Sequence, residues 1–272
     1  MKKIAIISDI HSNMTALDAI LEDCEKEEVT DYFILGDLLM PGPGSSEMLK
    51  KLRILPNTIF VKGNWDSYFT GLPSYSKEAF ENPTNIYGAI LAKYQHKYLT
   101  EDDKLFIKNL PMFIEVTIDG VKFLICHHLP NKNNGGELLP HSEQFNFDSI
   151  VEGRNIDVAV YGHIHAQLLR YSTDGTIILN SGAVLKSPHA NYLIVELDDG
   201  EVEGIIFKKV KYDIEKEIKL AKEFDLPYVD LYEKMLRTNI MYTHNIEVLE
   251  ILNNEFGYKE EALKFLEDVN AI

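Results

Sequence analysis

Seven side chains that can bind metal ions come directly after expected buried strands. They are Asp9, His11, Asp37, Asn64, His127, His163 and His165. Sites in open α/β sheets gather beyond the carboxyl ends of the strands, so five strand ends would bring these imidazoles, carboxylates and one amide to a single edge. Imidazole combined with carboxylate suits Mn, Fe, Zn or Co better than Ca or thiophilic metals. The pattern predicts a site for divalent transition-metal ions.

The spacing of these residues predicts two ions that share one ligand. Asp9 and His11 are one residue apart, so both side chains can face one ion. Asp37 is the expected bridge, because a carboxylate has two oxygens and can neutralise two cations. Asn64 adds a neutral oxygen. Two ions held about 3.5–4 Å apart can hold a hydroxide between them and bind both the attacking and the leaving oxygen of a phosphate ester.

Each motif taken alone has an ordinary structural interpretation. A single His after a strand is more often a hydrogen-bonded residue than a ligand, and Gly36-Asp37 could be a simple turn. The Gly162–His165 stretch is a stronger signal, because His163 and His165, two residues apart, can chelate one ion. The metal hypothesis depends on finding all the motifs in order, each at a strand end.

The elements that must position these residues follow from hydrophobic periodicity. Strands are expected at residues 3–8, 32–35 and 58–61, and helices at 14–28 and 45–52, which together predict a mainly parallel sheet with flanking helices. Helices are expected at 87–98 and 100–109. The following strands, at 113–117, 121–126, 155–160, 167–172, 176–179, 192–197 and 202–208, predict a second part that is largely antiparallel. The fold class is therefore α/β.

The C-terminal part of the chain is expected to be helical. Residues 214–224, 228–241, 246–254 and 260–269 all have helical spacing. The sequence therefore divides into a catalytic domain at 1–212 and a helical appendage at 213–272 that packs on it. The appendage is also where an oligomer contact would form, because amphipathic helices must bury their apolar faces on some partner.

Composition excludes several classes of function. The chain has 272 residues, 27 Lys and Arg against 43 Asp and Glu, and a formal charge of −16, which disfavours DNA, RNA and anionic membranes as partners. No apolar run approaches the roughly 20 residues of a membrane span. Cys24 and Cys126 have no CxxC partner and fit reduced, buried thiols. We therefore expect a cytoplasmic protein.

The ordered motifs resemble those of the calcineurin-like metallophosphoesterases. They are Asp9-Ile10-His11, Gly36-Asp37, Gly63-Asn64-Trp65-Asp66, His127 and Gly162-His163-Ile164-His165, and the resemblance covers roughly residues 1–210. It implies a sandwich of two mixed β-sheets flanked by helices. It also implies one ion on Asp9, His11, Asp37 and His165, and a second on Asp37, Asn64, His127 and His163. Asn64 would thus be both ligand and catalytic residue.

Within that family the chain looks most like bacterial asymmetrical diadenosine tetraphosphate hydrolases. The likeness is carried by residues 37–42, by Gly63-Asn64-Trp65, by residues 127–132 and by the helical tail. It implies Mn as the preferred metal, with Fe, Zn, Co or Ni as alternatives, and a nucleotide as the small-molecule substrate. Diadenosine tetraphosphate would be cleaved to ATP and AMP.

The chain departs from many relatives at Trp65, where they have a His that helps to protonate the leaving group. An indole N–H is not a useful acid, so His128, beside the ligand His127, becomes the candidate proton donor; its alternative role is support of the ligands. The substrate-binding candidates are Lys132, Tyr161, Arg170 and Asn180. Each of these could equally be an ordinary surface or packing residue.

Two other functions remain open at this level. One is a phosphodiesterase or phosphoprotein phosphatase that uses the same metals. The other is an idle scaffold that binds partners through its helical tail, although an idle relative would be expected to lose ligands, and this chain has the full set.

Overall fold

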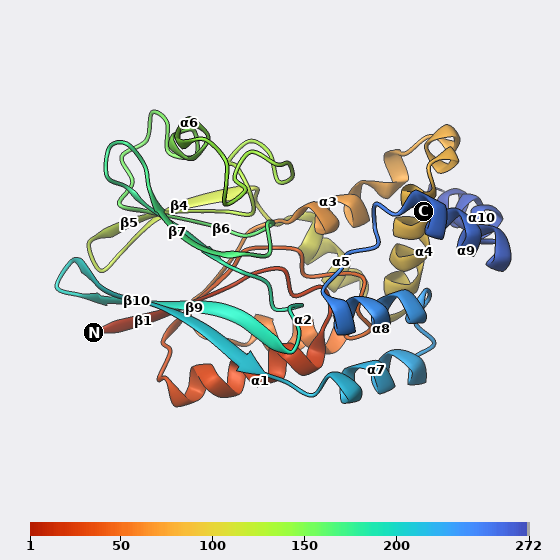
Figure 1. Cartoon of the computed structure of the whole chain (residues 1–272), viewed down its shortest axis with the longest axis horizontal. Helices are drawn as coiled ribbons and strands as arrows, with labels where there is room; N and C mark the ends of the chain where they lie inside the picture. Colours follow the sequence, from red (N-terminus) through yellow and green to blue (C-terminus); the bar gives the residue numbers. More distant parts are fainter. Residues whose placement is uncertain (271–272) are drawn as a thin grey trace.

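The structure, a computed structural model, describes residues 1–270 and consists of a two-sheet sandwich with a helical layer at one end (Figure 1). The first sheet has the order β10-β9-β1-β2-β3 and the second the order β4-β5-β6-β8-β7. Each sheet is mixed and has five strands. The fold class predicted from the sequence is therefore confirmed.

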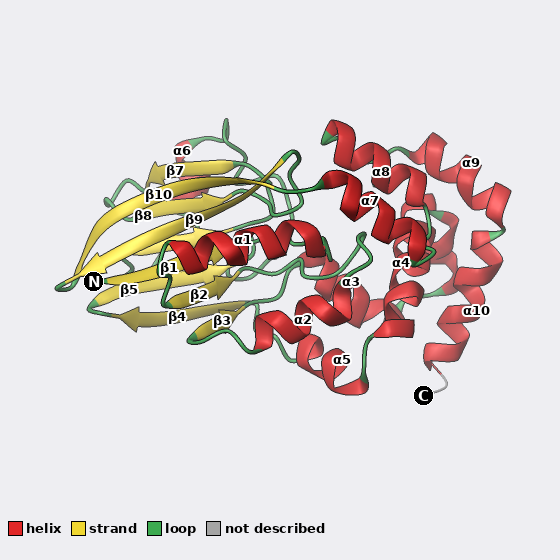
Figure 2. Cartoon of the chain, turned by 90° about the horizontal axis from the view of Figure 1, so that it is seen from below, coloured by secondary structure: helices red, strands yellow, loops and turns green. Residues whose placement is uncertain are grey.

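The first sheet is built around the parallel strands β1 (Lys2–Ile7), β2 (Asp31–Ile34) and β3 (Thr58–Phe60). Two antiparallel strands, β9 (His189–Asp198) and β10 (Glu201–Lys211), extend it beside β1. Helix α1 (Met14–Lys26) packs on β9 and β10, and α2 (Ser45–Arg53) lies beside it (Figure 2). The C-terminal ends of β1, β2 and β3 consequently meet at one edge.

The second sheet contains more parallel pairing than expected. It comprises β4 (Phe113–Ile118), β5 (Val121–Cys126), β6 (Val158–Tyr161), β7 (Gln167–Tyr171) and β8 (Ile177–Ser181). The pairs β5–β6 and β6–β8 are parallel, whereas β4–β5 and β7–β8 are the expected hairpins. The prediction of a largely antiparallel second part was wrong here, because the connection from β5 to β6 through α6 makes that pair parallel, and β6 then pairs in parallel with β8 rather than with β7.

The two sheets enclose an apolar layer. Ile4, Ile6 and Phe33 from the first sheet pack against Phe123 and Val160 from the second. The rings of Phe33 and Phe123 lie edge to face with centroids 5.3 Å apart. A short helix, α6 (Gln144–Asp148), covers the outer face of the second sheet. This packing places the ends of β5 and β6 near the ends of β1, β2 and β3.

The helical layer combines segments from the middle and the end of the chain. The middle supplies α3 (Asn64–Gly71), the short 3-10 turns η1 (Leu72–Ser74) and η2 (Lys77–Glu81), α4 (Pro83–Tyr98) and α5 (Glu101–Lys108). The end supplies α7 (Ile214–Glu223), α8 (Val229–Thr238), α9 (Ile246–Phe256) and α10 (Tyr258–Asn270). Helix α4 contacts both α9 and α10. Residues 271–272 of the predicted appendage lie outside the described residues.

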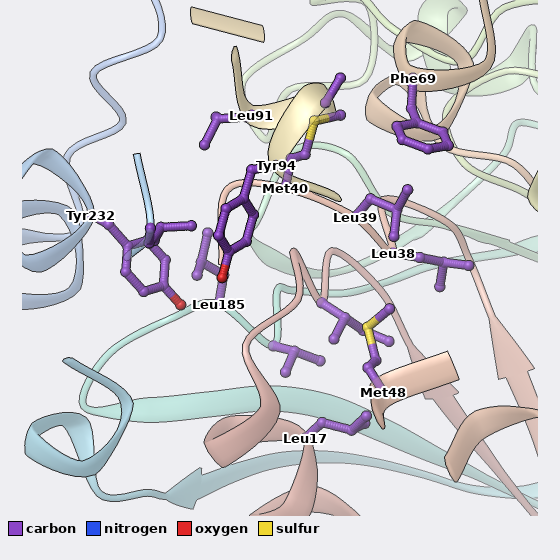
Figure 3. Close-up of a cluster of buried hydrophobic side chains, with 14 of the residues drawn as sticks. Leu17, Leu38, Leu39, Met40, Met48, Phe69, Leu91, Tyr94, Leu185 and Tyr232 are labelled. Atoms are coloured by element: carbon purple, nitrogen blue, oxygen red, sulfur yellow. The ribbon is translucent and has the colours of Figure 1, made fainter. Parts of the chain in front are cut away.

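The C-terminal helices belong to the same hydrophobic core as helices α1, α2 and α4, which pack beside the first sheet. Tyr232 of α8 lies near Leu185 and Tyr94, and the same cluster contains Leu38 and Met40 from the loop after β2 (Figure 3). Because the loop that contains Asp37 continues into this core, the packing of the C-terminal helices also supports the predicted metal ligands.

A buried carboxylate attaches these helices to the start of α1. Glu217 on α7 is fully buried and accepts hydrogen bonds from the Thr15 N–H at 3.1 Å and the Thr15 hydroxyl at 2.6 Å. The hydroxyl of Tyr232 donates to its other oxygen at 2.9 Å. An anion is stabilised at a helix N-terminus. The appendage is thus attached to the helix that follows the loop of Asp9 and His11.

Candidate metal centre and substrate cavity

The seven predicted ligands gather at the shared edge of the two sheets, on loops with unusual backbone geometry. Left-handed φ angles occur at Asp9 (55°), His11 (53°), Asp37 (49°), His163 (67°) and His165 (54°). Non-glycine residues in this region cost on the order of 1–3 kcal/mol each, and such residues cluster at functional sites. The surrounding structure therefore holds the ligands in conformations that they would not adopt in an isolated chain.

The first predicted ligand set converges on a point beside Asp9. Nε2 of His165 lies 3.2 Å from Asp9 Oδ1 and 3.3 Å from Nε2 of His11. Nε2 of His11 is 3.8 Å from Asp37 Oδ2. Four potential ligand atoms from three loops therefore face one position.

The second set converges on the other side of Asp37. Oδ2 of Asp37 lies 3.5 Å from Nε2 of His127, which is 3.2 Å from Oδ1 of Asn64. That amide oxygen is 2.9 Å from Nδ1 of His163. Oδ2 of Asp37 is close to both sets, as expected of a bridging ligand. Asp9 Oδ1 is also 3.9 Å from Nε2 of His127, so the two positions are adjacent.

Backbone carbonyls orient the imidazoles. Nδ1–H of His11 donates to Met40 O at 2.6 Å, and Nδ1–H of His127 donates to Leu35 O at 2.6 Å. A hydrogen bond at one ring nitrogen sets the tautomer and leaves the other nitrogen as a ligand. When either ring is neutral, its lone pair is consequently on Nε2, the atom that faces the carboxylates.

The loops of Asp37 and Asn64 are joined by a second buried carboxylate. Asp66 accepts from the N–H groups of Leu38 and Gly63, at 3.0 Å each. The Trp65 N–H, in the first turn of α3, donates to Asp37 Oδ1 at 2.8 Å. One oxygen of Asp37 is thus occupied by the backbone, and the other, Oδ2, is directed at the ligand sets.

The electrostatics of the cluster favour ionised carboxylates and a neutral imidazole at His163. Burial alone would raise the pKa of Asp9, but the facing imidazoles of His165 and His127 hold that pKa well below its usual range. Asp37 shows the same competition, in which His127 lowers its pKa. Burial lowers the pKa of His163 to about 4, so its ring is neutral at pH 7 and can donate a lone pair.

These residues fit divalent cations. Oδ1 of Asp9 is completely buried and has no hydrogen-bond partner within residues 1–270, while its Oδ2 accepts from the His163 N–H at 3.0 Å. A buried carboxylate oxygen without a hydrogen-bond donor is costly unless a cation neutralises it. The oxygen and nitrogen donors on both sides of Asp37 are those that Mn, Fe, Zn or Co accept.

Comparison with known sequences identifies the family. Residues 1–200 match the calcineurin-like phosphoesterase superfamily domain. The chain belongs to the calcineurin-like phosphoesterase superfamily. It is accordingly a metal-dependent phosphoesterase of a family that uses a dinuclear divalent metal centre, and the two adjacent sets of candidate ligands are available to hold such a centre.

Relatives extend the match beyond the catalytic domain. An uncharacterized protein of Methanocaldococcus jannaschii is 31% identical over 245 residues, which cover 87% of this chain and 93% of that protein. A hypothetical protein of Pyrococcus horikoshii OT3 has a similar structure, with a TM-score of 0.72 and 21% identity over 87% of this chain and 98% of its own. The structure of a metallophosphoesterase of Sphaerobacter thermophilus is also similar, with a TM-score of 0.67 and 23% identity, over 88% of this chain and 100% of its own. These two structures support the fold.

A cavity of about 650 Å³ opens onto the candidate metal ligands of this phosphoesterase. Asp37, Asn64, His163 and His165 line it together with three aromatic side chains, Trp65, Tyr68 and Tyr75. Another part of its wall comes from Lys186 and, in the segment between α8 and α9, from Asn239, Met241, Thr243 and His244. The sequence did not reveal this wall. Its helical spacing continued to residue 241, whereas α8 ends at Thr238, and local spacing carries no signal of a cavity.

The predicted substrate-binding residues lie elsewhere among residues 1–270. Lys132 is exposed and pairs with Glu137, and Tyr161 is fully buried, with its hydroxyl donating to Leu138 O at 3.0 Å. Arg170 lies over the ring of Phe147, 4.3 Å from its centroid. Asn180 is buried and donates to Gly162 O at 2.6 Å, which supports the loop of His163. None of these four lines the cavity.

His128 lies behind the ligands. Its side chain is buried, Nε2 is 2.9 Å from Glu137 Oε2, and its ring packs against that of His163 with centroids 4.9 Å apart. Burial lowers the pKa of His128, although Glu137 partly opposes the shift. His128 is not among the cavity-lining residues of the described chain. Its role in proton transfer stays a prediction.

Within residues 1–270, no helix has both the length and the apolar content that crossing a bilayer requires.

Proposed function

We propose that this phosphoesterase hydrolyses the phosphoanhydride or phosphodiester bonds of nucleotides, with dinucleoside polyphosphates as the leading substrate class. The observation that supports this best is the joint lining of one cavity by both ligand sets and by Trp65, Tyr68 and Tyr75. Aromatic faces can stack on a nucleobase while the phosphates reach the cations. A volume of about 650 Å³ is in the range of small-molecule sites.

The residues of the candidate centre have different roles in this hydrolysis. When bound, the cations polarise the phosphoryl oxygens and lower the pKa of a water molecule. Asp37 sets the spacing of the two positions, and Asn64 and His163 orient the oxygen of the scissile phosphate at one of them. Trp65, half-buried beside His11 with ring centroids 6.3 Å apart, excludes water from one side.

A phosphodiesterase or phosphoprotein phosphatase is the second candidate. A phosphoprotein phosphatase needs an open surface for a folded or extended partner, whereas here the segment after α8 lines the same cavity as the candidate ligands. The deciding experiment compares turnover of diadenosine tetraphosphate, bis(4-nitrophenyl) phosphate and a phosphopeptide with Mn present. Preference for the phosphopeptide would reject the nucleotide proposal.

Metal removal is expected to abolish activity. A chelator should reduce hydrolysis of bis(4-nitrophenyl) phosphate to background, and Mn should restore it better than Mg, because imidazole-rich sites favour the later metals. Elemental analysis of the same samples should show activity rising with bound metal. Full turnover in excess chelator, with no metal detected, would contradict the mechanism.

The effect of His128→Gln should depend little on the leaving group. Because His128 contacts His163 and Glu137 rather than the cavity, its loss should disturb ligand position and lower turnover similarly on nitrophenyl and alkyl diesters. An acid role predicts otherwise, since only poor leaving groups need a proton. Turnover of matched aryl and alkyl diesters decides: a loss confined to the alkyl ester would make His128 the proton donor.

A further inference from the structure

The segment between α8 and α9, residues 239–245, is called the strap here because it is attached on both sides of the cavity. At one end Asn239 exchanges two hydrogen bonds with Ser187: its Oδ1 accepts from the Ser187 N–H at 2.9 Å, and its amide donates to Ser187 O at 2.7 Å. Towards the other end, the Thr84 hydroxyl on α4 donates to Thr243 O at 2.9 Å. The strap is therefore a fixed wall.

Lys186 sits between the strap and the metal ligands. The preceding residue, Leu185, donates its N–H to Asp9 O at 3.2 Å, and Val184 donates to Ser8 O at 3.0 Å. The following residue, Ser187, is the one that exchanges two hydrogen bonds with Asn239. The backbone of Lys186 is thus anchored on one side to a ligand of the first ion and on the other side to the strap, and its side chain lines the cavity.

The charge of Lys186 has no acidic counterpart among the described residues 1–270. Within residues 1–270 it makes no ion pair. Most lysines that share this are exposed, such as Lys97 and Lys209, whereas Lys186 is half-buried. Among the described residues that line the cavity, Asp37 is the one carboxylate, and it belongs to the metal centre. In a chain of charge −16, a half-buried lysine without an acidic partner indicates an anionic ligand.

We propose that Lys186 binds a second anionic group of the substrate, a phosphate separate from the one that is hydrolysed, and that Asn239 is the positioning residue that holds it there. This inference rests on the proposed function and narrows it. Substrates with a chain of phosphates would be preferred over diesters with a single phosphate. Asn239 suits its place because it ends α8 with a φ of 58°, a conformation that Asn tolerates better than most residues.

The test compares two ligands that differ by one phosphate. AMP and ADP are measured as inhibitors of bis(4-nitrophenyl) phosphate hydrolysis by the full-length protein, with Mn in excess over nucleotide. The wild-type protein should bind ADP more tightly than AMP by roughly tenfold or more, the size expected of a charge-assisted hydrogen bond. Lys186→Met should remove most of that preference, and Lys186→Arg should retain much of it.

Two further variants make the result specific. Lys209→Met removes the same charge from the exposed face of β10, outside the cavity, and should keep the ADP preference. Asn239→Gly keeps the left-handed backbone but removes the two side-chain hydrogen bonds to Ser187. The preference for ADP should therefore fall while inhibition by AMP is retained. A purely structural role of Asn239 would weaken both nucleotides equally and would reject its role in positioning.

The outcomes separate the two proposals. If the Mn-loaded wild-type protein does not hydrolyse the diester, the proposed function fails. If it does, but Lys186→Met prefers ADP over AMP as strongly as the wild type, the proposed function stands and the role of Lys186 is overturned. The wild-type protein binding AMP and ADP equally would overturn it as well.

Discussion

Replacing Asp37 with Asn is expected to lower turnover by roughly 10³-fold or more, a barrier increase of about 4 kcal/mol. The bound metal should fall from two ions to one or none. The reason lies in the position of Oδ2, which is 3.8 Å from Nε2 of His11 in the first ligand set and 3.5 Å from Nε2 of His127 in the second. An amide NH₂ at that point is a donor, and it cannot neutralise two cations that repel each other.

The shape of the site should survive this substitution. Oδ1 of Asp37 accepts from the Trp65 N–H at 2.8 Å, and the Asn carbonyl can accept the same bond. Thermal unfolding without metal should therefore change little. This separates loss of charge from loss of fold.

Asn64→Ala is the matched comparison. It removes a neutral ligand from the second set only, because Asn64 Oδ1 lies near His127 and His163. Water can partly replace it, so the first ion should remain bound. Metal counting on both purified variants gives the answer. Two tightly held ions in Asp37→Asn would show that Asp37 is not the bridge.

The convergence of the candidate ligands was predictable because each of them follows a recognisable strand. β1, β2, β3, β5 and β6 all appear at or within a few residues of the expected ranges. Short apolar runs that end at Gly or polar residues predict buried strands. The two-sheet arrangement came from the resemblance in the ordered motifs rather than from periodicity.

The cavity was less predictable because tertiary packing, not local pattern, builds it. Helix α3 was missed because it is short, aromatic and flanked by Gly63 and Gly71, although Asn64 begins it. The C-terminal helices were expected, but the helix expected at 228–241 ends at Thr238, so residues 239–241 belong to the strap instead. Lys132 and Arg170, which are near the ligands in sequence, contact Glu137 and Phe147 and do not line the cavity.

The close contact between the loops of Asp37 and Asn64 leads to a steric prediction at Gly63. The loops of Asp37 and Asn64 touch through glycine backbones, and a Cβ added to Gly63 would overlap the backbone N and Oδ1 of Asp37, far inside van der Waals contact. Neither atom can move alone, because the Asp37 loop is tied to Asp66 through the Leu38 N–H and continues into the apolar core. Gly63→Ala must therefore push the bridging ligand out of position.

We expect Gly63→Ala to lower turnover by roughly 10²-fold or more, since displacing a catalytic group by about 1 Å has effects of that size. Overpacking should also destabilise the fold by about 1–3 kcal/mol. Gly71→Ala is the control at the other end of α3, where an added Cβ meets no atom within 4 Å and the backbone is helical, with φ −90° and ψ −11°. There Ala should keep turnover and raise stability by up to about 1 kcal/mol.

Turnover, metal content and thermal unfolding of the two variants separate the causes. A loss of metal and activity in Gly63→Ala at a temperature where the protein remains folded would locate the damage at the Asp37 loop. Wild-type turnover in Gly63→Ala would mean that the loops after β2 and β3 can separate without disturbing the centre. In that case the close contact of Gly63 with Asp37 would not be what positions the bridging carboxylate.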